Sequence, residues 1–275
     1  MSTPVIKNAD VLSVEGKIIA IIGSTGILGT EYVKYLAALG ATVIIGDVYI
    51  DKCIQLANEA EAAGFSCLPL EIDITDESSI SNFFELINKT YGKLDVLINN
   101  AQVKTEGFYA AFEDYSKETL LSVLDGNLVG VTLACKEATK LFLQQGYGNI
   151  INVASIYGVV GADQRIYDEV KNIYYPDQKF SSPVSYGIAK AGVIQLTKYL
   201  ASYYREKNIR VNCFTPGGVF DDHDDNFNSQ YSRRTTIGRM ADKREYNGVI
   251  QFLCSDASSY MTGTNLLADG GWCAI

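Results

Sequence analysis

The sequence predicts an α/β fold in which one parallel sheet of seven strands carries helices on both faces. Short β-branched runs alternate with amphipathic segments along the whole chain, and this order of strand, helix and strand is typical of a parallel sheet. The runs are almost entirely apolar, as expected for strands that helices cover on both sides. No internal repeat, low-complexity tract or proline-rich linker divides the 275 residues. We therefore expect a single domain over residues 1–275.

The first half of the chain supplies four of the predicted strands. "KIIAII" at 17–22 and "LDVLINN" at 94–100 are nearly continuous apolar runs. "ATVIIGD" at 41–47 and "SCLPLEID" at 66–73 are also β-branched or apolar, but each ends in an aspartate. The amphipathic segments between these strands, expected as helices, are 29–39, 51–63 and 78–91.

The second half supplies "GNIINVAS" at 148–155, "IRVNCFTP" at 209–216 and "TNLLADG" at 264–270. Its predicted helices are 116–144, 186–205 and 243–255. Three segments fit this alternation poorly: an N-terminal extension over 1–13, a polar, tyrosine-rich stretch over 157–184, and an acidic stretch over 220–238. The last two follow the carboxyl ends of strands, where open α/β sheets bind ligands.

Composition excludes several classes of function. The net charge of −9 argues against nucleic acid, which requires a basic face. None of the six cysteines forms a C-x-x-C pair and there is one histidine, so we expect no metal site. Several cysteines lie in apolar runs and are interpreted as buried thiols, which fits a cytoplasmic protein. We also expect no membrane association, because no apolar run approaches the roughly 18 residues of a span.

A glycine-rich turn follows the first strand. Gly23, Gly26 and Gly29 have the spacing G-x-x-G-x-x-G, and a helix follows them directly. Glycines allow a tight turn and a close approach to a pyrophosphate, and the helix N-terminus offers unpaired N–H groups to it. An ordinary turn between a strand and a helix is the alternative. In its context, the turn predicts a doubly wound, Rossmann-type nucleotide-binding fold.

The second strand ends at Asp47, 18 residues after Gly29. An acidic side chain there accepts hydrogen bonds from the adenosine ribose hydroxyls and repels a 2′-phosphate. No arginine lies beside Asp47, and Lys52 is interpreted as a solvated helix residue. The sequence therefore predicts NAD(H) in preference to NADP(H).

Four further motifs follow in order along the chain. They are "DGNLVG" with Asn127, "INVAS" with Ser155, "SYGIAK" with Tyr186 and Lys190, and "ADGGW" at 268–272. Together with the glycine turn, N-N-A at 99–101 and "PGGV" at 216–219, they resemble the single-domain branch of the short-chain dehydrogenase/reductase family. The resemblance covers about residues 17–272 and implies an oxidoreductase that uses a nicotinamide cofactor.

The catalytic residues expected are Asn127, Ser155, Tyr186 and Lys190. Tyr186 and Lys190 are four residues apart and share one helix face. The ammonium is expected to lower the pKa of the phenol toward the working pH, which suits Tyr186 as proton donor. The resemblance implies that Lys190 also holds the nicotinamide ribose, that Ser155 binds the substrate oxygen, and that Asn127 anchors a water.

The resemblance also assigns residues to the cofactor. They are Gly23, Thr25, Gly26, Ile27, Leu28 and Gly29 in the turn, Asp47, Asp73 and Ile74 at the adenosine, Asn99 and Ala101 beside it, and Tyr186, Lys190, Gly217 and Val219 at the nicotinamide end. Alternatives remain for some: Asn99 as a strand cap, Asp73 as a helix cap, and Asn127 in a local backbone role.

The sequence departs from the family pattern at several positions. Ile27 stands where the branch has glycine, a spacing that resembles the extended branch of epimerases and dehydratases. Gln102 replaces the glycine of N-N-A-G. The 31 residues from Ser155 to Tyr186 exceed the usual dozen.

The extra residues form the inserted loop within 157–184. It contains Arg165, Tyr167, Lys171, Tyr174 and Tyr175, which suit a polar substrate pocket. A surface elaboration or a subunit contact is the alternative.

The segment 220–238 is interpreted as a solvated, mobile lid, rather than a metal site, that closes with Arg233, Arg234 or Arg239 on an anion. With the inserted loop it resembles, more weakly, the flagellin-modification subgroup of surface-sugar biosynthesis. We therefore expect oxidation or reduction of a secondary alcohol or ketone on a sugar or sugar phosphate.

Three other functions stay open: a 3-oxoacyl-carrier-protein reductase, an epimerase or dehydratase, and a silent NAD-sensing protein. A 3-oxoacyl-carrier-protein reductase would need a basic patch and usually NADPH, whereas an epimerase usually adds a second domain. The family implies a homodimer or homotetramer paired through the helices 116–144 and 186–205.

Overall fold

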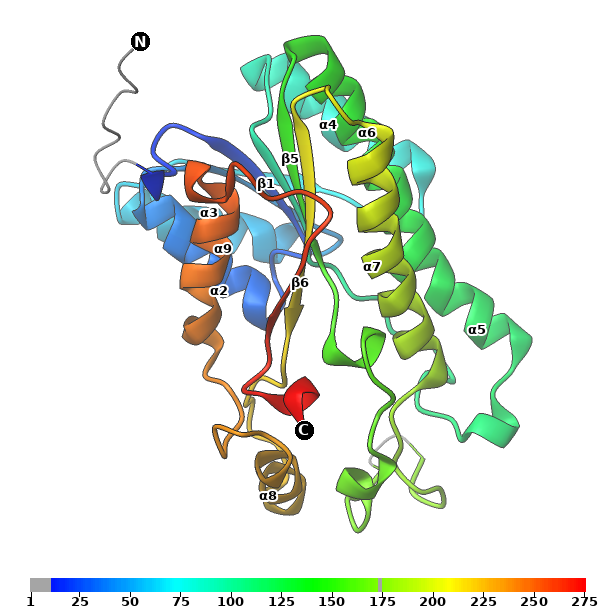
Figure 1. Ribbon diagram of the computed structural model, residues 1–275. Helices are drawn as coiled ribbons and strands as arrows, with labels where there is room; N and C mark the ends of the chain where they lie inside the picture. Colours follow the sequence, from blue (N-terminus) through cyan, green and yellow to red (C-terminus); the bar gives the residue numbers. More distant parts are fainter. Residues whose placement is uncertain (1–10, 173–174) are drawn as a thin grey trace.

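The computed structural model describes residues 11–172 and 175–275, so residues 1–10 of the predicted extension and Tyr174 of the inserted loop lie outside the described residues. Seven parallel strands form one sheet in the order β3-β2-β1-β4-β5-β6-β7 (Figure 1). The strands are β1 (Ile18–Ile22), β2 (Thr42–Asp47), β3 (Cys67–Glu71), β4 (Val96–Asn99), β5 (Gly148–Val153), β6 (Ile209–Pro216) and β7 (Asn265–Ala268). Each lies within a predicted run, so the predicted single-domain α/β fold is confirmed.

Helices cover both faces of the sheet (Figure 1). One layer contains α2 (Ile27–Ala38), α3 (Ile50–Ala62) and α9 (Asn247–Cys254). The other contains α4 (Glu77–Tyr91), α5 (Lys117–Leu124), α6 (Val131–Gln145) and α7 (Val184–Tyr203). A further helix, α8 (Asp225–Arg233), lies in the segment predicted as a lid.

The strand β1 shows why two helical layers form. Ile19 and Ile21 belong to the core beneath α2, whereas Ile18, Ala20 and Ile22 belong to the core on the other face. All five side chains are buried, because successive side chains of a strand point to opposite faces. Covering both faces is the arrangement that removes all of them from water.

The predicted helix 116–144 is two α-helices joined by a π-helical segment, Asp125–Gly130. Among the described residues, this continuous run, Lys117–Gln145, is long and apolar enough to cross a membrane by length and composition, which the apolar runs of the sequence did not indicate. Its inner side chains, including Ala134, Ala138 and Phe142, are buried in the core beside β4 and β5. The run therefore packs as a core helix of this fold. Core helices of this kind also meet the criterion of length and composition, so the run is not evidence of a membrane span.

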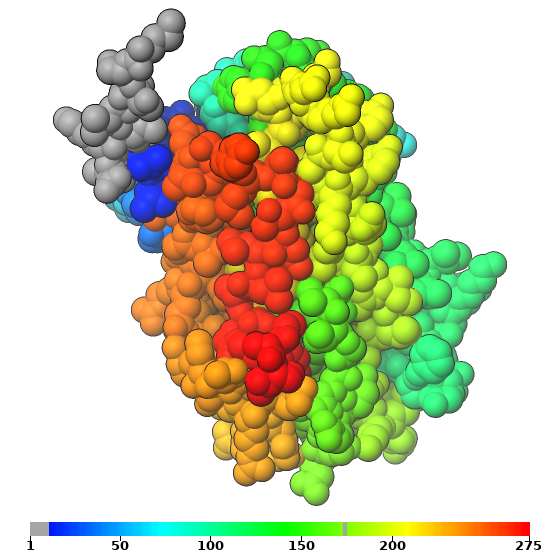
Figure 2. All heavy atoms as spheres, viewed as in Figure 1, coloured from blue at the N-terminus to red at the C-terminus, as the bar shows by residue number. Residues whose placement is uncertain are grey.

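Three segments beyond the sheet share a separate core. Ile166 and Tyr167 of the inserted loop, Tyr231 of α8 and Trp272 near the C-terminus are all buried in it. These segments lie together below the carboxyl ends of the strands in Figure 1. The space-filling view shows the α8 segment, the C-terminal residues and the inserted loop packed side by side (Figure 2).

Candidate active site

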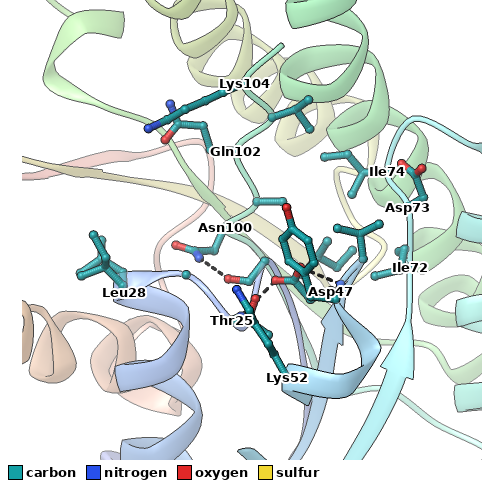
Figure 3. Close-up of a pocket in the computed structure, with 18 of the residues that line it drawn as sticks. Thr25, Leu28, Asp47, Lys52, Ile72, Asp73, Ile74, Asn100, Gln102 and Lys104 are labelled. Atoms are coloured by element: carbon teal, nitrogen blue, oxygen red, sulfur yellow. Dashed lines mark hydrogen bonds between the residues drawn. The ribbon is translucent and has the colours of Figure 1, made fainter. Parts of the chain in front are cut away.

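A cleft of 710 Å³ lies at the carboxyl ends of β1, β2 and β4 (Figure 3). β1 pairs with β2 on one side and β4 on the other, so consecutive loops leave the sheet in opposite directions here. Such a switch point is where open α/β sheets bind ligands. Of the residues assigned to the cofactor by sequence, the cleft is lined by Gly23, Thr25, Gly26, Ile27, Leu28, Asp47, Asp73, Ile74, Ala101 and Val219.

Gly23 is the position that needs glycine most. Its φ is +84°, and a Cβ there would lie 2.4 Å from the Cα of Ala101 on the neighbouring loop. A Cβ on Gly29 would lie 2.1 Å from the Gly23 carbonyl oxygen, so Gly29 lies behind the turn and packs it. The buried Ser24 hydroxyl accepts a hydrogen bond from the N–H of Gly46, which fastens the turn to β2.

The helix α2 begins directly after Gly26, so its first N–H groups face the cleft without intrahelical partners. Together with the helix dipole they favour an anionic group such as a pyrophosphate. Ile27, the first residue of α2, lines the cleft and is 45% exposed. The Ile27 side chain lies at the surface of the cleft and does not fill it. An isoleucine in place of the family's glycine therefore leaves the cleft open.

Asp47 lies at the cleft with one oxygen already fixed. Its Oδ2 accepts a hydrogen bond from the N–H of Thr25 at 3.0 Å. Lys52 also lines the cleft, and its ammonium lies 4.6 Å from the ring centroid of Tyr49. The interpretation of Lys52 as a solvated helix residue was therefore incomplete, because a cation borders the same space as Asp47.

The structure corrects the placement of Asn99. Its side chain is buried at the end of β4 and donates to Oδ1 of Asn152 on the neighbouring strand β5 at 2.8 Å. Asn100 lines the cleft instead and donates to the Gly23 carbonyl at 2.8 Å. Successive side chains of a strand point to opposite faces of the sheet. The amide of Asn100, and not that of Asn99, is therefore directed to the glycine turn.

Asn127 lies in the π-helical segment with its side chain buried. Its Nδ2 donates to the carbonyls of Val103 and Val123, and its Oδ1 accepts from the N–H of Val103. The side chain therefore holds the loop after β4 against the helix. This is the local backbone role that the sequence left open, and it uses both N–H groups of the amide.

Ser155, Tyr186 and Lys190 come together at the carboxyl end of β5. Ser155 caps a 3₁₀ turn two residues after the end of β5, and its side chain lies close enough to Tyr186, in the first turn of α7, to lower the pKa of the phenol. One helical turn later, the buried Lys190 ammonium lies 5.8 Å from the Tyr186 ring centroid and donates to the Val153 carbonyl. The sequence prediction that these three residues share one site thus agrees with their geometry.

The pKa of Tyr186 differs from the prediction. Burial raises the pKa of the Tyr186 phenol, and the Ser155 hydrogen bond lowers it only in part. Burial also lowers the pKa of Lys190 to about 8. The expected lowering of the Tyr186 pKa by Lys190 is therefore wrong, because desolvation of the phenol outweighs a cation that is directed to the Val153 carbonyl.

The two backbones that carry these groups approach closely at Gly158. A Cβ on Gly158 would lie 2.6 Å from the carbonyl carbon of Lys190 and 2.8 Å from the N–H nitrogen of Ala191. The contact sets the distance between the turn that carries Ser155 and the helix that carries Tyr186. A Cβ added to Gly161, three residues further on, would meet no atom of the described chain within 4 Å.

More tyrosines surround Tyr186 than the sequence indicated. The hydroxyls of Tyr157 and Tyr167 are 2.9 Å apart, and both lie close enough to Tyr186 for their charges to be coupled. Tyr109, from the loop after β4, also raises the pKa of Tyr186 by its charge. Tyr109 and Tyr157 were not predicted as site residues from the sequence. The only available signal was their position in the chain, Tyr109 in the loop after N-N-A and Tyr157 two residues after Ser155.

The cations of the inserted loop do not meet these tyrosines. Arg165 pairs with Asp163 at 2.7 Å and is largely exposed, whereas Lys171 is exposed. Tyr167 packs its ring on Phe180 and on Phe227 of α8. Tyr175 accepts a hydrogen bond from the N–H of Gly107.

The segment 220–238 is more ordered in its packing than the solvated lid that the sequence indicated. Asp224 caps α8, and Phe227 and Tyr231, four residues apart, turn their rings toward Tyr167 and Trp272. That aromatic pair after a capping aspartate was the available signal for a helix. Of the three arginines, Arg239 pairs with Glu245, Arg234 pairs with Asp163, and Arg233 is exposed.

Gly217 lines a separate cavity of 200 Å³ beside the end of the α8 segment rather than the main cleft. Its N–H donates to the Ala268 carbonyl of β7. Gly217 therefore joins the two last strands next to Val219, which does border the cleft.

In the described part of the chain, no three His, Cys, Asp or Glu side chains lie close enough together to bind a metal ion. All six cysteines are free and five are buried, as the apolar runs indicated. Burial raises the pKa of Cys53, Cys135 and Cys254 to about 12, so these thiols are poor ligands and nucleophiles.

A nicotinamide dinucleotide fits the remaining features. A Cβ at Gly23 would block the close approach of the turn to the neighbouring loop. The N-terminus of α2 faces the cleft, and Asp47 lies at the end of β2, where this class of fold binds the adenosine ribose. The opposite wall reaches Val219 and the loop that leads to Tyr109. Fold and site together define a nicotinamide-dependent oxidoreductase of the doubly wound α/β class.

Comparison with known proteins identifies the family. Residues 17–167 match the family model described as short chain dehydrogenase, and residues 173–273 match the one described as enoyl-(acyl carrier protein) reductase. The chain belongs to the short-chain dehydrogenase/reductase family and is an oxidoreductase that acts on alcohol or ketone groups.

Three curated relatives are similar over 94% of this chain. The 3-oxoacyl-[acyl-carrier-protein] reductase FabG of Thermotoga maritima is 30% identical and is covered over 99% of its length. The post-translational flagellin modification protein A of Campylobacter coli is 31% identical, covered over 98%. The cis-4-hydroxycyclohexanecarboxylate dehydrogenase of Sinomonas cyclohexanicum is 32% identical, covered over 97%. These near-equal identities single out no one activity.

Two solved structures have the same fold. A short-chain dehydrogenase from Leptospira borgpetersenii with bound NAD+ is 33% identical, with a TM-score of 0.81 over 99% of this chain and 98% of that chain. A gluconate 5-dehydrogenase from Burkholderia cenocepacia in complex with NADP and tartrate is 23% identical, with a TM-score of 0.84 over 97% and 98%.

The contact at Gly158 makes a prediction about stability. Gly158→Ala forces a methyl group against the α7 backbone and should lower the free energy of unfolding by about 1–3 kcal/mol. Gly161→Ala, which adds the same methyl to open space, should change it by less than about 0.5 kcal/mol. Urea denaturation of both variants measures the difference. Equal stability of the two would show that the two backbones can separate without cost.

Proposed function

We propose that the protein is an NAD(H)-dependent oxidoreductase that interconverts a secondary alcohol and a ketone on a polar, sugar-like substrate. The observation that carries the proposal is the convergence of Ser155, Tyr186 and Lys190 at the carboxyl end of β5, the strand next to β4, whose own carboxyl end borders the cleft that holds Asp47. When bound, the nicotinamide ring supplies or accepts the hydride.

Tyr186 is the proposed proton donor to the carbonyl oxygen in the direction of reduction. Its raised pKa keeps the phenol protonated at neutral pH, which suits a donor. The Ser155 side chain lies close enough to the phenol to influence its pKa and would hold the same substrate oxygen. Lys190, whose pKa of about 8 lies near the working pH, would hold the nicotinamide ribose and return the proton to Tyr186.

Asn127 has a different proposed role from that of the other three. Because its side chain already holds Val103, it would anchor a proton-carrying water through its main-chain carbonyl. The π-helical register at this residue supports the assignment, since π segments displace carbonyls from the regular helical pattern.

The preference for NAD(H) is supported by Asp47. Its carboxylate borders the cleft, and a 2′-phosphate close to it would be repelled. Lys52 offsets part of this repulsion from the same wall, so we expect a preference rather than an absolute exclusion of NADP(H). The relative that is 33% identical has bound NAD+.

The polar character of the substrate is supported by the hydroxyls around Tyr186. Tyr157 and Tyr167 direct their hydroxyls to one another and near that of Tyr186, and Tyr109 lies close by. Such hydroxyls bind ring or chain hydroxyls of a substrate better than an acyl chain. The 30% identity to FabG favours a second candidate, 3-oxoacyl-carrier-protein reduction, whereas the net charge of −9 opposes docking of an acidic carrier.

A homodimer or homotetramer in a reducing, cytoplasmic compartment completes the proposal. The free thiols suit such a compartment. The run Lys117–Gln145 and α7 lie side by side and keep large apolar side chains exposed. These are Leu121, Val129 and Leu143 on the first, and Ile188, Tyr199 and Tyr203 on the second. A second copy of the chain would cover them.

Removal of the Tyr186 hydroxyl tests the mechanism. Tyr186→Phe should lower turnover by about 10²–10⁴-fold while the affinity for NADH stays within about twofold. NADH oxidation is followed with a panel of keto-sugars and 3-ketoacyl thioesters, and NADH binding by its fluorescence. Tyr157→Phe, which removes a neighbouring hydroxyl, is the control and should cost less than about tenfold.

The outcomes of this panel separate the candidates. Undiminished activity in Tyr186→Phe would refute the proton-donor role. Turnover of thioesters alone would favour the carrier-protein reductase, and tight NADH binding without turnover of any substrate would favour a sensor.

A charge change at Asp47 tests the cofactor preference. The wild-type protein should bind NADH at least about tenfold tighter than NADPH, equivalent to ~1.4 kcal/mol. Asp47→Asn should reduce this ratio by a similar factor, whereas Asp51→Asn, the same change at an exposed residue of α3, should not. Fluorescence titration gives the six dissociation constants, for NADH and NADPH with each of the three proteins. A wild-type preference for NADPH would overturn the role of Asp47.

The exposed helix face makes a prediction about assembly. Leu121→Asp places a charge on the proposed interface and should shift the protein toward smaller species in sedimentation velocity. Leu86→Asp makes the same substitution on α4, where Leu86 is similarly exposed, and should leave the distribution unchanged. A wild-type protein that is monomeric at micromolar concentration contradicts the proposed assembly.

A further inference from the structure

The cleft contains two lysines, and they lie on opposite walls. Lys52 lies beside Asp47, whereas Lys104 and Gln102 project from the loop after β4 (Figure 3). Gln102 stands where the family has glycine, so both side chains add polar groups to this wall. The proposed function uses Lys52 in the cofactor preference but gives Lys104 and Gln102 no role.

Most cations of the inserted loop and of the segment 220–238 are paired with carboxylates, whereas Lys104, like the exposed Lys171 and Arg233, has no ion pair among the described residues. Arg165 and Arg234 pair with Asp163, Lys179 pairs with Asp168, and Arg239 pairs with Glu245. The ammonium of Lys104 lies instead 5.7 Å from the ring centroid of Tyr109, and no carboxylate among the described residues pairs with it. Lys104 therefore brings an uncompensated positive charge to the cleft.

The position of Tyr109 connects this charge to the reacting end of the site. The Tyr109 ring packs on Phe180 of the inserted loop, and its charge is felt by the Tyr186 phenol. Tyr109 therefore contacts Lys104 on one side and influences the Tyr186 phenol on the other. The ammonium of Lys104 thus lies on the cleft side of the loop that brings Tyr109 to the reacting end of the site.

We propose that Lys104, assisted by Gln102, binds an anionic group of the substrate, a carboxylate or a phosphate. This inference rests on the proposed function and narrows it to an acidic polyhydroxylated substrate, such as a sugar acid or a sugar phosphate. The protein carries a net charge of −9, so an anion needs a local cation to approach. An ammonium and an amide provide charge-assisted and neutral hydrogen bonds to the same oxygens.

The test measures binding of small anions to the NAD+-saturated protein by calorimetry. The probes are tartrate and glycerol 3-phosphate, each compared with its neutral counterpart, threitol or glycerol. The wild-type protein should bind at least one anion tenfold or more tightly than its counterpart. Lys104→Met should remove most of that preference, Lys104→Arg should keep it, and Lys52→Met, which removes the other cleft lysine, should leave it unchanged.

Each result decides the inference independently of turnover. Loss of the preference in Lys104→Met alone supports it, and the more tightly bound anion identifies the group. Absence of any preference in the wild-type protein, or an equal loss in Lys52→Met, overturns it. A weaker affinity for NAD+ in Lys104→Met with unchanged anion binding also overturns it, because Lys104 would then serve the cofactor. The proposed redox function fails separately, if Tyr186→Phe retains full activity.

Discussion

The reversal of strand order at β1 is the constraint on which the rest of the structure depends. Because β2 and β4 flank β1, the chain leaves β1 toward one face and later reaches β4 from the other. The loops after β1 and β4 therefore meet over the end of β1, and they can do so only if Gly23 lacks a side chain. The same meeting opens the cleft, aims the N-terminus of α2 into it and places Asn100 against the turn.

The sequence predicted the sheet well because its strands are buried on both faces and so are apolar without interruption. It predicted the site where a short motif fixes geometry, as with the helical spacing of Tyr186 and Lys190. It assigned Asn99 in place of Asn100 because strand alternation depends on where β4 ends, which a motif does not specify. It misjudged the pKa of Tyr186 because burial of the phenol depends on loops distant in sequence, including Tyr109 and Tyr157.

The inserted loop and α8 illustrate a second limit. Neither has a strong apolar pattern alone: the inserted loop was expected to form part of a polar substrate pocket, and the segment 220–238 a solvated, mobile lid. They acquire structure from one another: Tyr167 stacks near Phe227, Asn226 donates to the Asp168 carbonyl, and Asp163 pairs with Arg234. Contacts between two irregular segments separated by some sixty residues follow from the tertiary fold, and local composition does not encode them.

The aromatic core around Tyr167, Tyr231 and Trp272 is separate from the two cores that flank the sheet. Its packing energy therefore contributes little to the half of the molecule that holds the nucleotide. Because of this division, substitutions in the outer cluster can change its packing while the sheet and its glycine turn stay unaltered. Diversification of substrate range in this protein would thus be expected to proceed by repacking three peripheral segments together, as one evolutionary module.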